Sequence, residues 1–293
     1  MSSPSSSQPS EWTVIYHGSR AFKGRGEFLQ LMLEDAGITN YEYKSDDLYG
    51  PSGMMDLFRG ETIQDVAPQH VGLVGSNDIP TFPMLAPPAL MHRPPNTGGG
   101  HKDEVVVVSQ VGACMIYLGD VLGYAPQSIP EKARANAIML SPLDYISEGR
   151  RTFHPIKDKM SYNDQKEEGD KVSKEWSQTR MKIYLGHFNK LVEYNNKVLS
   201  NNDGDGSKSE SSSYTKPIAG GPSITYADFA LFHVLHATEK QFNTSFYDMV
   251  WDELCKQDIK PLQEWYEWMK SRPNLVAYLK SDRAAPFSGN SMM

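Results

Sequence analysis

The apolar and polar positions of the chain follow a strand-like pattern at first and a helical one later. Residues 11–16 are β-branched and aromatic, which is typical of a strand, and residues 40–44 alternate as a second strand does. Between them the sequence predicts a helix from Gly24 to Gly37. Its apolar face consists of Leu29, Met32, Leu33 and Ala36. A helix that crosses between two early strands predicts that these strands pair in parallel.

A proline interrupts the next apolar run, Phe82-Pro83-Met84-Leu85. We predict a third strand over residues 82–86, which Pro87-Pro88 interrupts and which resumes as far as His92, because proline cannot donate to a ladder. A fourth strand is predicted over residues 104–109, after a turn-rich loop, and the short link predicts antiparallel pairing. A helix over 110–122, closed by Gly123, completes a small mixed sheet of four strands with helices on its faces.

From Pro130 onward the chain shows no strand pattern. Helices are predicted over residues 131–148, 164–199, 261–270 and 273–280, and residues 201–216 form a polar, flexible insertion. The clearest local signal is Thr225-Tyr226-Ala227-Asp228, in which Thr225 caps a helix and Asp228 returns a hydrogen bond to the cap. The pattern therefore predicts an α+β N-terminal domain followed by an all-helical C-terminal domain.

Composition narrows the class of protein. The net charge of −7 argues against a general nucleic-acid binder, and no apolar run approaches the roughly 20 residues that span a bilayer. The Ser/Pro-rich start lacks the features of a secretory signal, and we interpret residues 1–11 as a disordered lead-in. Cys114 and Cys255 are the only cysteines, which excludes a disulfide framework and favours a reducing, cytoplasmic location.

Several segments, in this order, resemble the glutathione transferases. Pro83 stands where that family keeps a cis-proline, and residues 109–119 are similar to its glutathione-carboxylate segment and following helix. The box from Thr225 to Asp228 matches the cap in the family's helical domain. Tyr16 followed by Gly24-Arg25-Gly26-Glu27 is similar to tyrosine-type, sigma-like members. His154-Pro155 and residues 162–168 resemble a less studied branch from microbes and algae.

The resemblance implies a fold and a function. It implies a thioredoxin-like, glutathione-binding domain over residues 12–124 and a helical domain over 130–287. Glutathione would be a co-substrate, with no prosthetic group and no metal, and its thiolate would be conjugated to a small apolar electrophile in detoxification. The resemblance also implies a homodimer, with neither nucleic acid nor membrane as a partner.

Catalysis would depend on one hydroxyl near the end of the first strand. Lowering a thiol pKa by two units requires about 2.7 kcal/mol of selective thiolate stabilisation. A hydrogen bond to a charged group contributes about 1.5–3 kcal/mol, so a single hydroxyl supplies most of it. The resemblance makes Tyr16 the first assignment and Ser19 the alternative, since serine-type members place their hydroxyl just after this strand.

The remaining candidate residues would bind substrates. Phe82 would hold the cysteinyl backbone of glutathione, and we predict a cis bond at Pro83. Gln110 matches a position that grips the γ-glutamyl end, with Ser109 beside it, but Val111 stands where the family commonly has serine. Arg25 would bind a carboxylate or fix the start of its helix. In the helical domain, His154 and Tyr162 are the candidates for the second-substrate cleft.

Two other functions remain open. Val111 and the long turn after Tyr16 are consistent with a non-catalytic, glutathione-transferase-like binding or scaffold protein. A glutathione-dependent isomerase or peroxidase would use the same motifs. The loop of residues 93–104 and the insertion of 201–216 are interpreted as surface additions.

Overall fold

The structure is a computed structural model with two compact units, residues 1–117 and 118–293. It describes residues 10–18, 21–45, 84, 86–95, 105–157, 160–202, 216–243, 245–247, 251, 253–254 and 258–287.

The first unit contains a four-stranded mixed sheet in the order β2-β1-β3-β4. Strand β1 (Glu11–Ile15) pairs in parallel with β2 (Glu42–Lys44), and the helix α1 (Glu27–Asp35) connects them. Strands β3 (Ala89–Arg93) and β4 (Val106–Ser109) are antiparallel neighbours, and β3 also runs antiparallel to β1. The predicted mixed sheet is therefore confirmed, with the parallel pair where a helix crosses over and the antiparallel pair where the link is short.

The third strand starts later than predicted. It begins at Ala89, whereas Met84 and Ala86 lie outside any strand, so the prediction of a strand over 82–86 is wrong for the residues that the structure describes. Two successive prolines without N–H groups precede Ala89, and ladder pairing begins only after them. The described part of the chain has one cis peptide bond, Pro87–Pro88. Phe82 and Pro83 lie outside the described residues.

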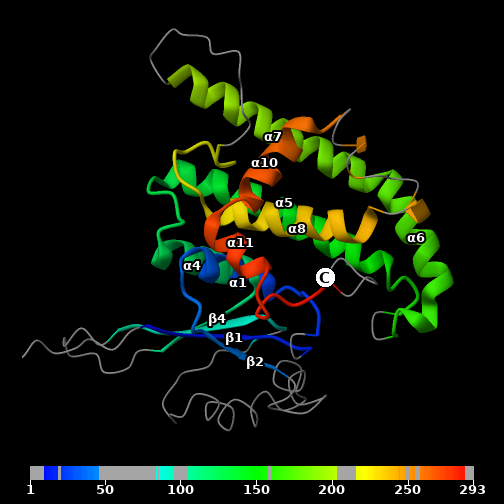
Figure 1. The fold of residues 1–293 in the computed structure, drawn as a ribbon, viewed down its shortest axis with the longest axis horizontal. Helices are drawn as coiled ribbons and strands as arrows, with labels where there is room; N and C mark the ends of the chain where they lie inside the picture. Colours follow the sequence, from blue (N-terminus) through cyan, green and yellow to red (C-terminus); the bar gives the residue numbers. More distant parts are fainter. Residues whose placement is uncertain are drawn as a thin grey trace, which may run out of the picture. The chain divides into compact units, whose positions relative to one another are not determined.

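Helices α1 and α4 (Val111–Leu122) lie on the same face of the sheet (Figure 1). On this face the ring of Trp12 stacks on that of His92 at 3.7 Å, and His92 Nδ1 lies 2.7 Å from Tyr117 Oη on α4. All nine residues of α1 are buried, although the pattern predicts only one apolar face. Its polar side is covered in part by Tyr41, whose hydroxyl donates to Glu34 at 3.0 Å.

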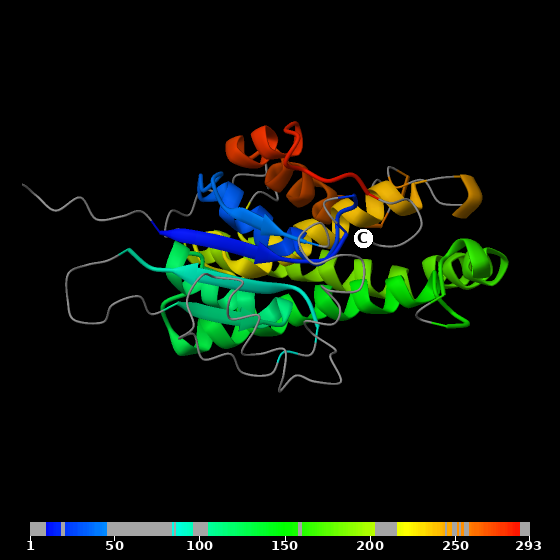
Figure 2. The ribbon, with the colours of Figure 1, turned by 90° about the horizontal axis from the view of Figure 1, so that it is seen from below.

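The described residues of the second unit form helices and connecting loops, with no strand. It contains α5 (Ile129–Thr152), α6 (Lys166–Gln178), α7 (Arg180–Asn202), α8 (Tyr226–Phe242), α10 (Lys260–Lys270) and α11 (Pro273–Leu279), with short 3₁₀ turns at Asn163–Gln165 and Ser245–Tyr247. The predicted single helix over 164–199 is two helices, because the chain breaks at Thr179. In Figure 2 the helices coloured green to yellow, α5, α7 and α8, run alongside one another, and α8 packs on α5 and α10.

The core of the second unit is aromatic. Tyr145 is fully buried, and its hydroxyl lies 2.6 Å from Thr238 Oγ1 on α8. Its ring contacts those of Trp176 and Phe188 with centroids 5.1 and 5.9 Å apart. These contacts tie α5, α6, α7 and α8 into one packed layer. None of the described helices is long and apolar enough to span a membrane.

Candidate functional site

Three strand ends meet at one end of the sheet in the first unit. The register pairs Ile15 with Ala89 and Ala89 with Ser109, so these residues form one row across β1, β3 and β4. Tyr16, Pro88 and Gln110 each stand one residue beyond that row. Because neighbouring strands are about 4.8 Å apart, the segments after β1 and β4 are separated by roughly 10 Å. An extended tripeptide has about the same length.

Tyr16 continues the sheet after β1, since its N–H donates to Lys44 O at 3.0 Å. Its ring is only 2% exposed and stacks on His17 at 4.3 Å. The other side of the ring lies against the turn into α1. A Cβ on Gly24 would come within 2.2 Å of Tyr16 Cε1 and 2.6 Å of its Oη. The glycine is therefore needed for this approach, and the Tyr16 hydroxyl lies beside the turn that begins α1.

A buried ion pair fixes this turn. Lys23 Nζ lies 2.5 Å from Glu27 Oε1, and their side chains are 4% and 1% exposed. Gln30 Nε2 donates to the other oxygen of Glu27 at 3.4 Å. Arg25, predicted to bind a carboxylate or to fix the helix start, is half-buried in the same turn, and Ser19 lies outside the described residues. The ion pair between Lys23 and Glu27 was not predicted from the sequence. Opposite charges four residues apart were the signal that could have indicated it.

The segment after β4 has an unusual backbone at Gln110. Its φ is +73°, in the left-handed region that non-glycine residues seldom adopt, and its carbonyl accepts from Cys114 N at 2.9 Å. Gln110 is exposed, whereas Ser109 and Val111 on either side are 7% and 6% exposed. The turn thus presents Gln110 to solvent and leaves little of Ser109 accessible. Such a backbone is a recurrent feature of ligand-binding turns.

Pro87 lies in the segment before β3 and offers a backbone acceptor. The residue that precedes the cis bond is Pro87, which has no N–H and so can give a peptide ligand only its carbonyl. The predicted cis bond at Pro83 and the backbone clamp at Phe82 lie outside the described residues and stay predictions.

Cys114 is not a candidate nucleophile. It is buried, its Sγ lies 3.2 Å from Val108 O, and burial raises its pKa to about 12. A thiol with that pKa is almost entirely protonated at neutral pH.

His154 and Tyr162, the two candidates for the second-substrate cleft, lie in the loop between α5 and α6. His154 Nδ1 is 3.1 Å from Met160 O. The Tyr162 hydroxyl donates to Asp170, and its pKa is raised to about 12, first by burial and then by this carboxylate. His154 thus contacts the backbone of the loop and Tyr162 contacts Asp170 on α6, and their place in a second-substrate cleft stays a prediction.

Gln165 organises that loop and was not singled out from sequence. Its side chain is buried, and its Oε1 accepts from Ile156 N at 2.9 Å. Its Nε2 donates to the carbonyls of Met160 and Lys157 at 2.9 and 3.0 Å. One side chain thus satisfies backbone groups of a loop whose described residues before Asn163 form no helix or strand. Nothing in the one-dimensional pattern distinguishes this glutamine from an exposed one.

Gln165→Ala is expected to open the loop without unfolding the helices around it. The variant loses the hydrogen bonds to Ile156 N, Lys157 O and Met160 O, which costs about 1–3 kcal/mol. Amide hydrogen exchange of residues 154–161 should accelerate, while exchange in α7 stays unchanged. Gln178→Ala, at an exposed position on α6, is the matched control and should leave both unchanged. Equal protection of the loop in the two variants would contradict this role.

The predicted capping box at the start of α8 is confirmed. Asp228 is completely buried, and its Oδ2 accepts from Thr225 N at 2.8 Å and from Thr225 Oγ1 at 2.9 Å. Its Oδ1 accepts from Ile218 N at 2.7 Å, so the carboxyl also holds the preceding loop. Burial raises the pKa of Asp228 to about 6, although these hydrogen bonds act in the opposite direction.

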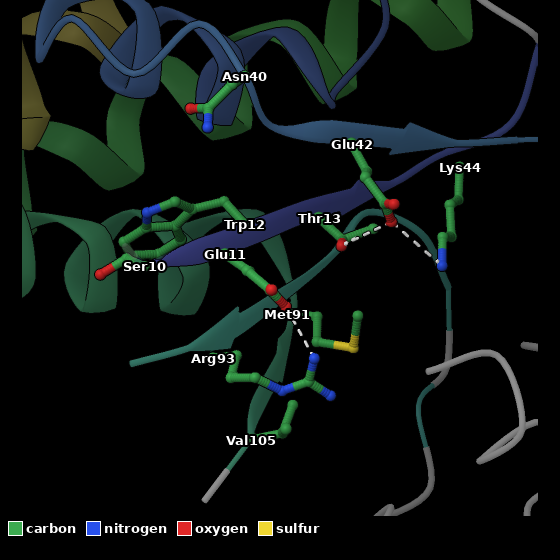
Figure 3. A pocket seen from close by; sticks show the side chains of 10 residues that line it. All are labelled: Ser10, Glu11, Trp12, Thr13, Asn40, Glu42, Lys44, Met91, Arg93 and Val105. Carbon is green, nitrogen blue, oxygen red and sulfur yellow. Dashed lines mark hydrogen bonds and ion pairs between the residues drawn. The ribbon is translucent and has the colours of Figure 1, made fainter. Parts of the chain in front are cut away.

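A separate polar cavity of about 420 Å³ lies at the other end of the sheet, where β1 begins and β3 ends. Figure 3 shows that its charged side chains pair with one another, one pair joining β3 to β1 and the other lying within β2. Arg93 Nη1 lies 2.7 Å from Glu11, and Lys44 Nζ lies 3.2 Å from Glu42. Because these charges compensate each other, the cavity gives no preference for a ligand of either sign.

No group of three or more histidine, cysteine, aspartate or glutamate side chains in the described parts of the chain is arranged to hold a metal ion.

Comparisons with known proteins agree with the architecture. Residues 151–282 match the family model for the glutathione S-transferase C-terminal domain. A search of curated proteins finds no match.

Solved structures with the same fold include a pi-class glutathione S-transferase from Onchocerca volvulus, at 17% identity and a TM-score of 0.57, over 96% of this chain and 97% of that one. A sigma-class glutathione S-transferase from Fasciola hepatica has 16% identity and a TM-score of 0.55, over 92% of this chain and 96% of that one. Ure2p, solved in complex with glutathione, has 14% identity and a TM-score of 0.53, over 94% of this chain and 95% of that one. At these identities the likeness shows the fold: a thioredoxin-like unit followed by a helical one.

Proposed function

We propose that this protein is a glutathione transferase whose first unit binds glutathione at the end of the sheet formed by the segments after β1, before β3 and after β4. The observation that carries the proposal is the row Ile15–Ala89–Ser109, which brings Tyr16 and Gln110 to one sheet end at a spacing of roughly one extended tripeptide. The domain match over residues 151–282 supports the same family of functions.

In this proposal Tyr16 activates the thiol. Its hydroxyl donates a hydrogen bond to the glutathione sulfur and stabilises the thiolate by about 1.5–3 kcal/mol. The thiolate attacks an electrophilic carbon, so that with an activated aryl chloride an S–C bond forms, the C–Cl bond breaks and chloride leaves. The thiol proton passes to solvent. Gln110 grips the γ-glutamyl end, and Arg25 fixes the helix start beside the site.

A small apolar electrophile would be held by the second unit, and the active form would be a cytoplasmic homodimer. No prosthetic group is invoked, because thiolate addition needs none.

A non-catalytic glutathione-binding protein is the second candidate. The burial of Tyr16, at 2% exposure, favours it, because a thiol must reach the hydroxyl to be activated. Val111 favours it too, since its side chain supplies no hydroxyl beside Gln110. A glutathione-dependent isomerase or peroxidase would use the same site and is separated by substrate assays.

Tyr16→Phe tests the catalytic assignment. We expect conjugation of chlorodinitrobenzene to slow by about 10- to 100-fold, the kinetic equivalent of losing one hydrogen bond to the thiolate, with glutathione affinity nearly unchanged. Tyr194→Phe, at an exposed position on α7, is the matched control and should retain full activity.

The outcomes separate the candidates. Wild-type turnover by Tyr16→Phe would remove Tyr16 from the mechanism. Glutathione binding by calorimetry without turnover of any electrophile would support the non-catalytic candidate. Absence of binding at millimolar glutathione, with the protein folded, would contradict the site itself.

A further inference from the structure

A glycine in the loop before α8 lies against two polar side chains from other helices of the second unit. Gly220 has a φ of +84°, and a Cβ built on it would come within 3.0 Å of Arg134 Nη1 and 3.2 Å of Asn195 Oδ1. Arg134 belongs to α5 and Asn195 to α7, two helices that pack on each other (Figure 2). Because glycine carries no side chain, a space bounded by a guanidinium and an amide stays open at this point.

The amide of Asn195 is buried and lacks a partner. Only 3% of Asn195 is exposed, and its Nδ2 makes no hydrogen bond within the part of the chain that the structure describes. A buried N–H without an acceptor is unusual, because it has lost its hydration and nothing replaces it. A half-turn of the amide exchanges Oδ1 and Nδ2 and points the N–H into the space beside Gly220. An acceptor placed in that space would therefore satisfy Asn195.

Arg134 brings a positive charge to the same space. Its side chain is exposed, and no other described residue forms an ion pair or a hydrogen bond with it. Arg180, in contrast, is bound to Glu148 by two hydrogen bonds of 2.7 and 3.1 Å. A guanidinium without a carboxylate keeps its N–H groups for the oxygen atoms of a ligand, which it binds two at a time. The charge of Arg134 thus favours an anion with several oxygens.

The loop that carries Gly220 is anchored but accessible. Ile218 and Ala219 are 0% and 3% exposed, and the N–H of Ile218 donates to Asp228 at 2.7 Å. The other oxygen of Asp228 accepts twice from Thr225, so both oxygens of this carboxyl are occupied. Gly220 itself is half-buried, so solvent reaches the space beside it. A site on anchored backbone loses less entropy when a ligand binds.

We propose that Arg134, Asn195 and Gly220 form a binding site for a phosphate dianion, either as the free ion or as a monoester on a serine side chain. Two oxygens of the phosphate accept from the guanidinium of Arg134, and a third accepts from the amide of Asn195 beside Gly220. A tetrahedral anion suits donors from two different helices better than a planar carboxylate does. The site is independent of the proposed glutathione site, because its residues all belong to the second unit.

Titration of the full chain with inorganic phosphate, followed by ³¹P NMR, tests the proposal. We expect a dissociation constant of about 1–10 mM at pH 7.5 and binding about fivefold weaker at pH 5, where phosphate is a monoanion. Acetate should displace phosphate only at about fivefold higher concentration, and added salt should weaken binding. An end-blocked Gly-phosphoserine-Gly peptide is the second arm. Tighter binding of this peptide than of inorganic phosphate identifies a phosphorylated chain as the ligand, and weaker binding identifies the free ion.

Three variants test the residues of the site. Arg134→Gln should weaken phosphate binding about tenfold or more, because the charged donor is lost. Asn195→Leu keeps a similar volume without the amide and should weaken binding about threefold. Gly220→Ala places a methyl group in the open space and should weaken binding about tenfold. Saturating glutathione should leave the affinity of the wild-type protein for phosphate unchanged.

Arg151→Gln and Gly221→Ala are the matched controls. Arg151 is an exposed arginine on the same helix α5, and a Cβ on Gly221 would meet nothing within 4 Å. Both variants should bind phosphate like wild type. Wild-type affinity in Arg134→Gln, an equal loss in Arg151→Gln, or acetate binding as tight as phosphate would each overturn the proposal. Circular dichroism identifies an unfolded variant, and if the positive φ of Gly220 makes Gly220→Ala one, Arg134→Gln decides.

Discussion

Asp228→Ala is expected to lower the free energy of unfolding of the second unit by about 3–5 kcal/mol at pH 5. The carboxyl is completely buried and binds Thr225 N, Thr225 Oγ1 and Ile218 N. Alanine leaves two backbone N–H groups buried without an acceptor, and each costs about 1–3 kcal/mol. Urea unfolding followed by tryptophan fluorescence reports this loss, because four of the five tryptophans, Trp176, Trp251, Trp265 and Trp268, lie in this unit.

A second capping box, at the start of α5, is accessible to solvent and provides a matched control. At the start of α5, Ser128 and Glu131 form a capping box whose members are exposed or half-buried, with Ser128 Oγ donating to Glu131 at 2.7 Å. Glu131→Ala should cost only about 0.5–1 kcal/mol, because water replaces the lost partner. Comparable losses in the two variants would show that burial of Asp228 is not what makes its box strong.

The pH dependence of the second unit follows from the same carboxyl. The folded pKa of Asp228, about 6, lies above the unfolded value near 3.9. The native state therefore keeps a proton that the unfolded chain releases, so this contribution is fully present below about pH 4 and is lost as the pH rises through 6. We expect the second unit to lose about 3 kcal/mol between pH 4 and 7, and Asp228→Asn to remove that dependence.

Local signals in the sequence predicted the parts of the fold that depend on a few adjacent residues. The box at Thr225 and Asp228 was found because its donors and acceptors are three residues apart. The sequence predicts the mixed sheet because the length of the connection between two strands decides whether they pair in parallel or antiparallel. The apolar run before Pro87 and Pro88 predicts the third strand too early, because these two prolines delay pairing until Ala89.

Features that depend on distant partners were not predicted. The Gln165 side chain binds backbone groups five to nine residues before it, and the pattern of apolar and polar positions does not reveal these contacts. The group of Arg134, Asn195 and Gly220 joins three segments that only the helical packing brings together. At the proposed glutathione site, the sequence predicted Tyr16 at the end of the first strand, but its burial depends on the glycines of the following turn.

The first unit is expected to depend on pH in the opposite sense, because of His92. Its side chain is 3% exposed, its ring stacks on Trp12 at 3.7 Å, and its Nδ1 lies 2.7 Å from Tyr117 Oη. In the part of the chain that the structure describes, its Nε2 is buried without a hydrogen-bond partner. A second proton on this ring would therefore place a charge where no group compensates it.

Burial lowers the pKa of His92 to about 4, below the unfolded value near 6.5. The unfolded chain therefore takes up a proton in a pH range where the native state does not. The contribution of His92 to stability is present above about pH 6.5 and is lost as the pH falls through 4. The difference in pKa corresponds to about 3 kcal/mol, which is a large fraction of the stability of a typical domain.

Hydrogen exchange of the full chain, resolved by mass spectrometry, measures the two units separately. We expect protection of β1, β3 and α1 to fall by about 3 kcal/mol between pH 7 and 4, after correction for the pH dependence of intrinsic exchange. His92→Phe keeps an aromatic ring against Trp12 but cannot be protonated, so it should abolish this loss. His187→Gln removes an exposed histidine on α7 and should leave the loss intact. Persistence of the acid dependence in His92→Phe would assign it to another group in the first unit.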